Sequence, residues 1–482
     1  MSNSVAKKLF SGAFWVGFQT VGMKIFSIAS QLILAWILIP EDFGKFSLVL
    51  SITAFSLILQ SFGFTDILIS RGKAFSLLYN LSQSICLVLA IGSWILTVLF
   101  AIIGGILYED QELTWLIVIY SFTTPFITMA LVPESKVRID LRFKELSIIQ
   151  LLQLFFVQLL IVIFAFCGLG VYSFVIAPVP IAIIRFWYLY RITNLPFQFN
   201  FTLRRWWHIG INSSWGLVHA LCQRIILQAD YLLLGLVVTK AILGIYYLAY
   251  SLSVQAVGLL TNALTPVLFP VLVTIPKEDT EKLHTILRQM ILTFSMLGMP
   301  FAIWQCVAAE PLILLFLEDK WKDTIPLVQI LSIGIGFHVV GSLWMVSVRI
   351  RSAFRQQAMY SIFATLIFLG VLIPSVLLYN SVGTAAGVSI FHIISSPLLL
   401  YYANRHFRIT FQYIIKSLLT YFGISILIFG FGFYTVHYYN LSIVWSFIIN
   451  VVVSPLLYIL ILYTFDKKFK ALVLKFKGII KR

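Results

Sequence analysis

The sequence predicts an all-α integral membrane protein with about fourteen transmembrane helices, arranged as two pseudo-symmetric six-helix lobes followed by two C-terminal helices. Of its 482 residues, 60% are hydrophobic and 11% are charged, and the mean hydropathy is +0.99. Soluble domains carry roughly 25% charged residues. Long apolar runs recur from end to end, and about 20 apolar residues let a helix cross a bilayer. An internal repeat, described below, is the third observation behind this prediction.

The first apolar run follows Lys7 and Lys8. It is too long for the apolar region of a signal peptide and has no small-residue cleavage site, so we expect it to be the first transmembrane helix. Thirteen further runs follow, separated by short polar connections. The predicted transmembrane segments are residues 11–38, 44–66, 76–107, 113–132, 146–167, 169–190, 209–238, 242–273, 286–308, 325–348, 357–379, 382–403, 413–436 and 441–464.

Positive charge alternates along these connections. The N-terminus, the even-numbered connections and the C-terminal tail hold 27 of the 34 Lys and Arg residues, whereas the odd-numbered connections hold four. Cytoplasmic connections of membrane proteins are enriched in Lys and Arg. We therefore expect both termini in the cytoplasm. The net charge of +16 follows from this orientation and does not indicate a nucleic-acid partner.

Three connecting segments are amphipathic: residues 133–145, residues 310–323 and the basic tail at 467–482. Such segments lie in the lipid headgroup layer, and a basic one favours anionic lipid. Simple anchoring of the topology is the alternative interpretation of the tail.

The repeat is visible when the chain is shifted by 200 residues without gaps. Several uncommon residues then coincide, and the matched pairs are Trp15 and Trp215, Lys24 and Arg224, Gly44 and Gly244, Phe46 and Tyr246, and Ser51 and Ser251. We interpret this as a duplicated helical lobe. The expected divisions are an N-terminal lobe at 1–208, a second lobe at 209–404, two more helices at 405–466 and the cytoplasmic tail at 467–482.

Two cations lie near the middle of predicted transmembrane helices, Lys24 in the first and Arg224 in the seventh. Gln31 shares the face of Lys24, and Gln228 shares the face of Arg224. Because a charge is costly in lipid, these side chains need a water-filled cavity or an anionic partner. A bound pyrophosphate group would supply that partner. An internal ion pair to an acid on another helix is the alternative.

Asp230 lies in the same helix as Arg224 but on a different face, because six residues turn an α-helix by about 240°. It is a candidate site for a coupling cation, and structural pairing is the alternative. Arg185 lies near a predicted cytoplasmic helix end and is expected to extend its side chain to the interface. The four cysteines and seven histidines show no metal-ligand spacing, and no nucleotide-binding loop is present. We therefore expect no metal and no cofactor.

Several short stretches resemble one family of membrane transporters. They are Ser-Gly-Ala-Phe-Trp at 11–15, Ile-Pro-Glu-Asp-Phe-Gly at 39–44, Asp230 with the Leu-rich segment 232–235, Leu-Gly-Ile-Tyr-Tyr-Leu-Ala-Tyr at 243–250, Leu-Phe-Pro at 268–270, and Glu-Pro at 310–311 leading to Lys-Trp at 320–321. In this order they resemble the oligosaccharide flippases of the multidrug/oligosaccharidyl-lipid/polysaccharide export superfamily, in its Wzx-type branch. The resemblance implies fourteen helices, two six-helix lobes and an alternating-access cavity.

The resemblance also implies a substrate, an oligosaccharide on a polyprenyl diphosphate, which is moved across a bacterial cytoplasmic (inner) membrane for surface polysaccharide synthesis. Lys24, Arg224, Gln31 and Gln228 would bind it, and Asp230 would couple transport to a cation. Membrane lipids, a glycan polymerase and chain-length proteins are the expected partners. Two alternatives are a cation-coupled multidrug exporter, which would need acids in its cavity, and a membrane glycan polymerase or ligase, which would need a sizeable outer loop.

Overall fold

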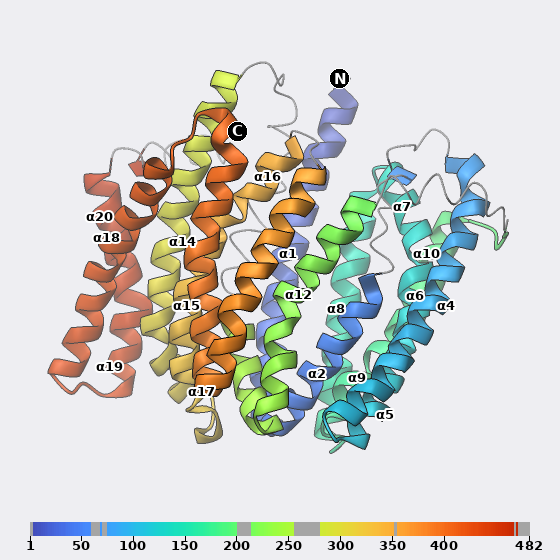
Figure 1. Cartoon of the computed structure of the whole chain (residues 1–482), viewed down its shortest axis with the longest axis horizontal. Coiled ribbons are helices and arrows are strands. Elements are labelled where there is room, and N and C mark those ends of the chain that lie inside the picture. The colour runs from blue at the N-terminus through green and yellow to red at the C-terminus, as the bar shows by residue number, and fades with distance from the viewer. Residues whose placement is uncertain are drawn as a thin grey trace.

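The protein is a bundle of long helices (Figure 1). The structure is a computed structural model and describes residues 3–58, 68–69, 75–199, 214–254, 280–350, 354–466 and 469–470. Several predicted features lie outside these residues: parts of the second, seventh and eighth transmembrane segments, the boundary between the predicted lobes at 208/209, the motif at 268–270 and nearly all of the tail at 467–482. No β-strand occurs in the described ranges.

The helices follow the order of the predicted segments. Their bounds are α1 (Asn3–Ile37), α2 (Pro40–Ser56), α4 (Phe75–Leu107), α5 (Gln111–Ser121), α6 (Thr123–Met129), α7 (Leu131–Ile139), α8 (Phe143–Phe166), α9 (Tyr172–Ile176), α10 (Pro178–Thr193), α12 (Ser214–Val237), Lys240–Val254, α14 (Thr280–Phe316), α15 (Thr324–Gly341), α16 (Leu343–Ile350), α17 (Phe354–Asn404), α18 (Phe411–Tyr438), α19 (Ile443–Phe447) and α20 (Ser454–Phe465). A π-helical segment joins the last two helices.

Eleven helices in the described ranges are long and apolar enough to cross a membrane. The all-α membrane fold is thereby confirmed, and the count of fourteen stays a prediction. One of the eleven is the 51-residue α17, which would be about 77 Å long if it were straight. Its backbone leaves helical geometry at Tyr379 and Asn380, and this break lies between the eleventh and twelfth predicted segments.

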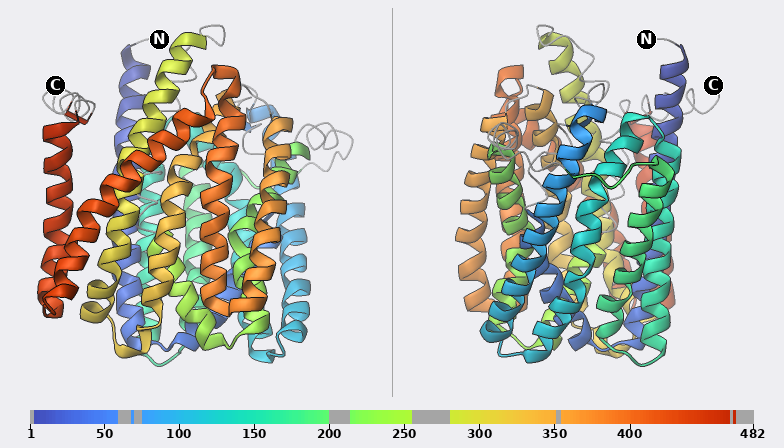
Figure 2. Two further views of the ribbon diagram at one scale, coloured as in Figure 1. Left: turned by 60° about the vertical axis from the view of Figure 1, so that its left-hand side comes forward. Right: turned by 90° about the vertical axis from the view of Figure 1, so that its right-hand side faces the viewer.

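The helices form two sets with α1 and α12 between them (Figures 1 and 2). On one side α4 packs against α5 and α6, α10 packs against α6, and α8 packs against α1. On the other side α14 packs against α15 and α18, and α17 packs against α12 and α15. Contact between α2 and α12 links the two sets. The N-terminal end of α1 and the C-terminal end of α20 lie at the same end of the bundle.

Tight turns at the opposite end, which the charge pattern predicts to be outside the cell, are set by local sequence. Pro40 begins α2 after the short break that ends α1, and acids occupy the first turn of α2, where they favour a helix N-terminus. Asp110 caps α5, since its carboxylate accepts a hydrogen bond of 3.1 Å from the Leu113 amide.

Two of the amphipathic segments do not lie wholly at the surface as predicted. Residues 131–139 form α7, in which Pro133, Glu134, Ser135 and Val137 are buried. The segment predicted at 310–323 begins inside α14 and includes Trp321, which is 0% exposed. Both segments therefore contribute buried side chains to the packed interior.

Candidate functional site

Two glycines hold the helices together at the end of the bundle that the charge pattern predicts to face outside, which we call the outer end. A Cβ atom on Gly44 would lie 1.9 Å from the carbonyl oxygen of Lys240, and a Cβ atom on Gly244 would lie 1.7 Å from the carbonyl oxygen of Pro40. Both distances are far below van der Waals contact, so only glycine fits at either position. We call this reciprocal contact the glycine crossing. Its members are 200 residues apart, as are the two carbonyl residues.

Two hydrogen bonds are reciprocal in the same way. The Ser51 hydroxyl donates to the Gln228 side-chain oxygen at 2.9 Å, and the Ser251 hydroxyl donates to the Gln31 side-chain oxygen at 3.1 Å. In each bond a serine from one predicted lobe meets a glutamine from the other; these lobes, residues 1–208 and 209–404, are called the two halves below. The contacts join the two halves, and Gln31 and Ser251 also line the cavity described next.

The connection after α14 covers the end of α1. The Trp321 indole donates a hydrogen bond of 2.8 Å to the Ala35 carbonyl, and the Lys320 ammonium donates one of 3.1 Å to the Trp36 carbonyl. These carbonyls belong to the last turn of α1, where helical carbonyls lack partners and cations are favourable. The Trp321 ring also meets Phe43 edge to face at 5.1 Å.

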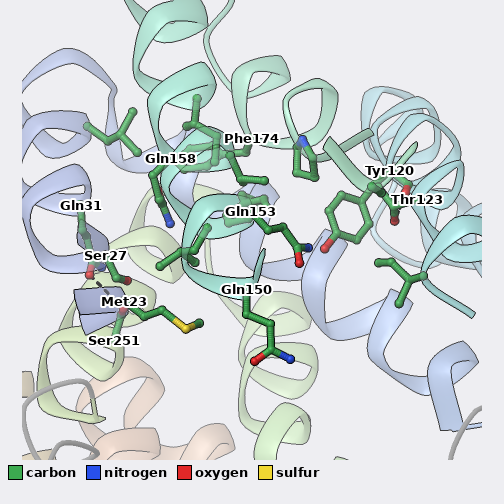
Figure 3. A pocket seen from close by; sticks show the side chains of 18 of the residues that line it. Met23, Ser27, Gln31, Tyr120, Thr123, Gln150, Gln153, Gln158, Phe174 and Ser251 are labelled. Carbon is green, nitrogen blue, oxygen red and sulfur yellow. Dashed lines mark hydrogen bonds between the residues drawn. The ribbon is translucent and has the colours of Figure 1, made fainter. Parts of the chain in front are cut away.

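A cavity of about 580 Å³ lies beneath this closed end. Its walls come from α1, α2, α5, α6, α8, α9, α10 and the helix Lys240–Val254, and its polar lining consists of Ser27, Gln31, Tyr120, Thr123, Gln150, Gln153, Gln158, Arg185, Tyr247 and Ser251. Gln150, Gln153 and Gln158 project from α8 between Ser27 and Gln31 on one side and Tyr120 and Thr123 on the other (Figure 3). Its volume is within the range of about 300–1,000 Å³ that is usual for ligand pockets.

Hydrogen bonds between α1 and α8 orient these amides. The Gln19 amide donates to the Gln150 side-chain oxygen at 2.6 Å, and the Ser30 hydroxyl donates to the Gln158 side-chain oxygen at 2.6 Å. Because α1 and α8 pack closely, the polar groups of one helix fix those of the other. The arrangement gives the cavity a set of neutral donors and acceptors.

Arg185 enters the cavity from α10, and the prediction that its side chain reaches the membrane interface is wrong. Its guanidinium pairs with Glu134 of α7, and the two side chains are only 12% and 11% exposed. Arg138 donates to the other Glu134 oxygen at 2.7 Å. The sequence pattern did not reveal this cluster, because Glu134 lies in a segment that also holds Lys136 and Arg138.

The structure brings only part of the predicted site together. Gln31 lines the cavity, whereas Lys24, Arg224, Gln228 and Asp230 are not among the lining residues. Lys24 lies beside the lining residues Met23 and Ser27 on α1 and is half-buried. No ion pair to Lys24 or Arg224 occurs among the described residues. Their role in binding stays a prediction.

Asp230 is 1% exposed and lies among tyrosines rather than cations. The Tyr246 hydroxyl donates to one of its oxygens at 2.8 Å, and the other oxygen has no partner in the described part of the chain. The ring of Tyr246 in turn meets Tyr231 and Tyr250. Across the same described ranges, no cluster of three His, Cys, Asp or Glu residues could hold a metal ion.

Comparison with known proteins identifies the family. The family model described as "Polysaccharide biosynthesis protein" matches residues 33–326. The lipopolysaccharide biosynthesis protein WzxC of Escherichia coli K12 is 22% identical over 416 residues, which cover 82% of this chain and 80% of that protein. The teichuronic acid biosynthesis protein TuaB of Bacillus subtilis 168 is 25% identical over 449 residues, with 90% and 91% coverage.

The fold also has a solved counterpart. The lipid II flippase MurJ in an inward closed conformation aligns with a TM-score of 0.75 at 15% identity, over 93% of this chain and 98% of that one. At this identity the likeness concerns the fold alone. The family model covers more than half of the sequence, so this multi-pass membrane protein belongs to the polysaccharide biosynthesis protein family.

Proposed function

We propose that the protein is a flippase for oligosaccharide linked to a polyprenyl diphosphate, acting in the bacterial cytoplasmic membrane with both termini in the cytoplasm. The cavity is the observation that carries this proposal. Amides and hydroxyls line it beneath a closed outer end, and such groups hydrogen-bond well to sugar hydroxyls. A glycan headgroup would enter from the cytoplasmic side while its lipid chain stays in the bilayer.

Alternating access would come from two lobes, residues 1–208 and 209–404, with 405–466 added outside them. The reciprocal contacts of Gly44 with Lys240 and of Gly244 with Pro40 support this division, because a pseudo-two-fold relation between lobes produces matched contacts. Rocking of the lobes would separate the glycine crossing and open the cavity outward. Glycan polymerases and chain-length proteins are proposed as the partners that then use the substrate.

Relatives with biosynthetic names support transport of a glycan over transport of a drug. A multidrug exporter for organic cations would need acids in its cavity, and no carboxylate belongs to the cavity lining among the described residues. Lys24 and Arg224, on the first helix of each half, are proposed to hold the diphosphate. A side chain that donates hydrogen bonds to a charged group contributes about 1.5–3 kcal/mol, which corresponds to roughly a tenfold to hundredfold change in affinity.

The function is tested by following lipid-linked oligosaccharide in a strain that lacks the gene. We expect the intermediate to accumulate on the cytoplasmic side and wild-type protein to clear it. Lys24→Ala and Arg224→Ala should each reduce clearance about tenfold or more, whereas Arg191→Ala, at an exposed position on α10, should not. Normal export by both variants at normal expression would refute the diphosphate site. Unpolymerised glycan outside the cell would instead indicate an enzyme.

Asp230 is proposed to couple transport to a cation gradient, since it is a buried carboxylate with one oxygen unpartnered within the described residues. Asp230→Asn keeps the shape and the Tyr246 hydrogen bond. We expect this variant to fold normally and to flip substrate at a rate that no longer responds to an imposed proton or sodium gradient. Tyr246→Phe is the control, because it removes the hydrogen bond and keeps the charge. Full gradient dependence in Asp230→Asn would exclude the coupling role.

A further inference from the structure

Arg185 is the charged side chain in the cavity. Every other lining residue in the described part of the chain is apolar or carries a neutral amide or hydroxyl. Arg185 reaches the cavity from the middle of α10 and lies near Gln150 of α8, because both side chains contact Glu134. A single cation among neutral polar groups gives this end of the cavity a positive electrostatic potential.

The ion pair with Glu134 does not cancel that charge. Glu134 uses one oxygen for Arg185 and the other for Arg138, at 2.7 Å. The Gln150 amide also donates to Glu134, at 3.4 Å. Two guanidinium groups therefore share one carboxylate, and the cluster keeps one net positive charge. Arg138 is 43% exposed whereas Arg185 is 12% exposed. Glu134 therefore holds Arg185 as a buried cation beside the cavity while sharing its negative charge with a second guanidinium.

A buried guanidinium is costly unless its charge and all its donors are offset. Arg185 is 12% exposed, and its buried Nε atom has no hydrogen-bond partner among the described residues. Buried polar groups are nearly always satisfied, so an unsatisfied donor on a cavity-lining side chain needs an explanation. An anionic ligand in the cavity would offset the charge, and a small shift of the guanidinium would let Nε donate to it.

Two kinds of anionic oxygen could meet Arg185, a phosphate or a carboxylate. The diphosphate must stay where the polyprenyl chain can leave for the bilayer, at the line between the halves. The main packing partners of α10 are instead α6, α7, α8 and α9, and the figures place it away from α12. The neighbouring side chains of Gln150 and Gln153 suit sugar hydroxyls. The surroundings of Arg185 therefore favour a carboxylate on the glycan.

We propose that Arg185, held by Glu134, is a specificity residue that binds the carboxylate of an acidic sugar, such as a uronic acid, in the transported oligosaccharide. This inference rests on the proposed flippase function and names the glycan class. A guanidinium binds a carboxylate through charge-assisted hydrogen bonds, and the adjacent amides would bind the hydroxyls of the same sugar ring.

The test measures binding of three lipids to the purified protein in nanodiscs. They are undecaprenyl diphosphate without sugar, the same lipid with a neutral trisaccharide of glucose and N-acetylglucosamine, and the same trisaccharide with one glucose replaced by glucuronic acid. We expect wild-type protein to bind the acidic lipid about tenfold or more tightly than the neutral one. Arg185→Gln should remove this preference and leave neutral-lipid binding within about twofold.

Two further variants serve as controls for the loss of a cation and for folding. Arg191→Gln removes a cation from an exposed position of the same helix and should keep the preference. Arg185→Gln combined with Glu134→Gln removes both members of the ion pair, so its folding does not depend on a buried Glu134 carboxylate held by Arg138 alone. It should lose the preference as Arg185→Gln does.

The outcomes separate this inference from the proposed function. Equal binding of acidic and neutral lipids by wild-type protein would overturn the acidic-sugar site and leave the flippase proposal standing. Weaker binding of sugar-free undecaprenyl diphosphate to Arg185→Gln would overturn it in favour of a diphosphate contact. Failure of all three lipids to bind wild-type protein would refute the proposed function and this inference together.

Discussion

Replacing Gly244 with alanine is expected to keep the outer end of the bundle open and to reduce glycan export to background. The added methyl group would lie 1.7 Å from the Pro40 carbonyl oxygen, and a backbone atom cannot rotate out of the way. Overpacking of a core typically costs about 1–3 kcal/mol, and an overlap with backbone belongs at the upper end. A cost of about 3 kcal/mol to the closed state shifts its population roughly a hundredfold.

Closure is measured with a thiol in the cavity. In a protein whose native cysteines Cys86, Cys167, Cys222 and Cys306 are replaced by serine, Ser27→Cys puts the thiol on the lining. A membrane-impermeant maleimide applied from outside should label it weakly, and Gly244→Ala should increase the labelling at least tenfold.

Gly92→Ala is the matched control, since a Cβ atom there would meet nothing within 4 Å. It adds the same methyl group to a transmembrane helix and should change neither labelling nor export. If maleimide labelling of Ser27→Cys stayed weak in the Gly244→Ala variant, the glycine crossing would not be what closes the outer end.

The sequence singled out these glycines without revealing their contact. A shift of 200 residues aligns Gly44 with Gly244 because both halves keep one ungapped register. That alignment cannot tell whether matched residues touch, since contact depends on how the N-terminal turns of α2 and Lys240–Val254 approach in space. The helical membrane fold was predictable for a stronger reason: in lipid, every backbone polar group must be bonded within the segment.

The site was less predictable. Gln31 was found from its helical spacing to Lys24, and it lines the cavity. Arg185 and Glu134 are 51 residues apart, and local charge patterns do not reveal pairs at such a separation. Near a helix end, a buried ion pair and a side chain extended to the interface produce the same sequence pattern. Residues 133–145 also alternate charged and apolar side chains, which hid the burial of Glu134 in α7.

Trp321→Ala is expected to cause the largest loss of stability of any single side-chain truncation at the outer end. The side chain is 0% exposed, meets Phe43 edge to face, and donates to the Ala35 carbonyl at 2.8 Å. Truncation of a buried Trp costs about 3–5 kcal/mol. The change would also leave the last turn of α1 without one of its caps, so the free energy of unfolding in mixed detergent–lipid micelles should fall by this amount.

Trp321→Phe divides the effect into its two causes. Phenylalanine keeps a ring against Phe43 but is smaller than the indole and cannot donate to the Ala35 carbonyl. We therefore expect a loss above the about 1 kcal/mol of one hydrogen bond and below the about 3–5 kcal/mol of the alanine variant. Trp115→Ala is the control for removing an indole, because Trp115 is 59% exposed on the outer surface of the helix set and its loss leaves no internal cavity. Equal destabilisation by Trp321→Ala and Trp115→Ala would mean that Trp321 does not anchor the connection after α14 to α1. A larger loss in Trp321→Ala, with Trp321→Phe between the two, would show that one buried indole joins the two halves of the chain where the cavity is closed.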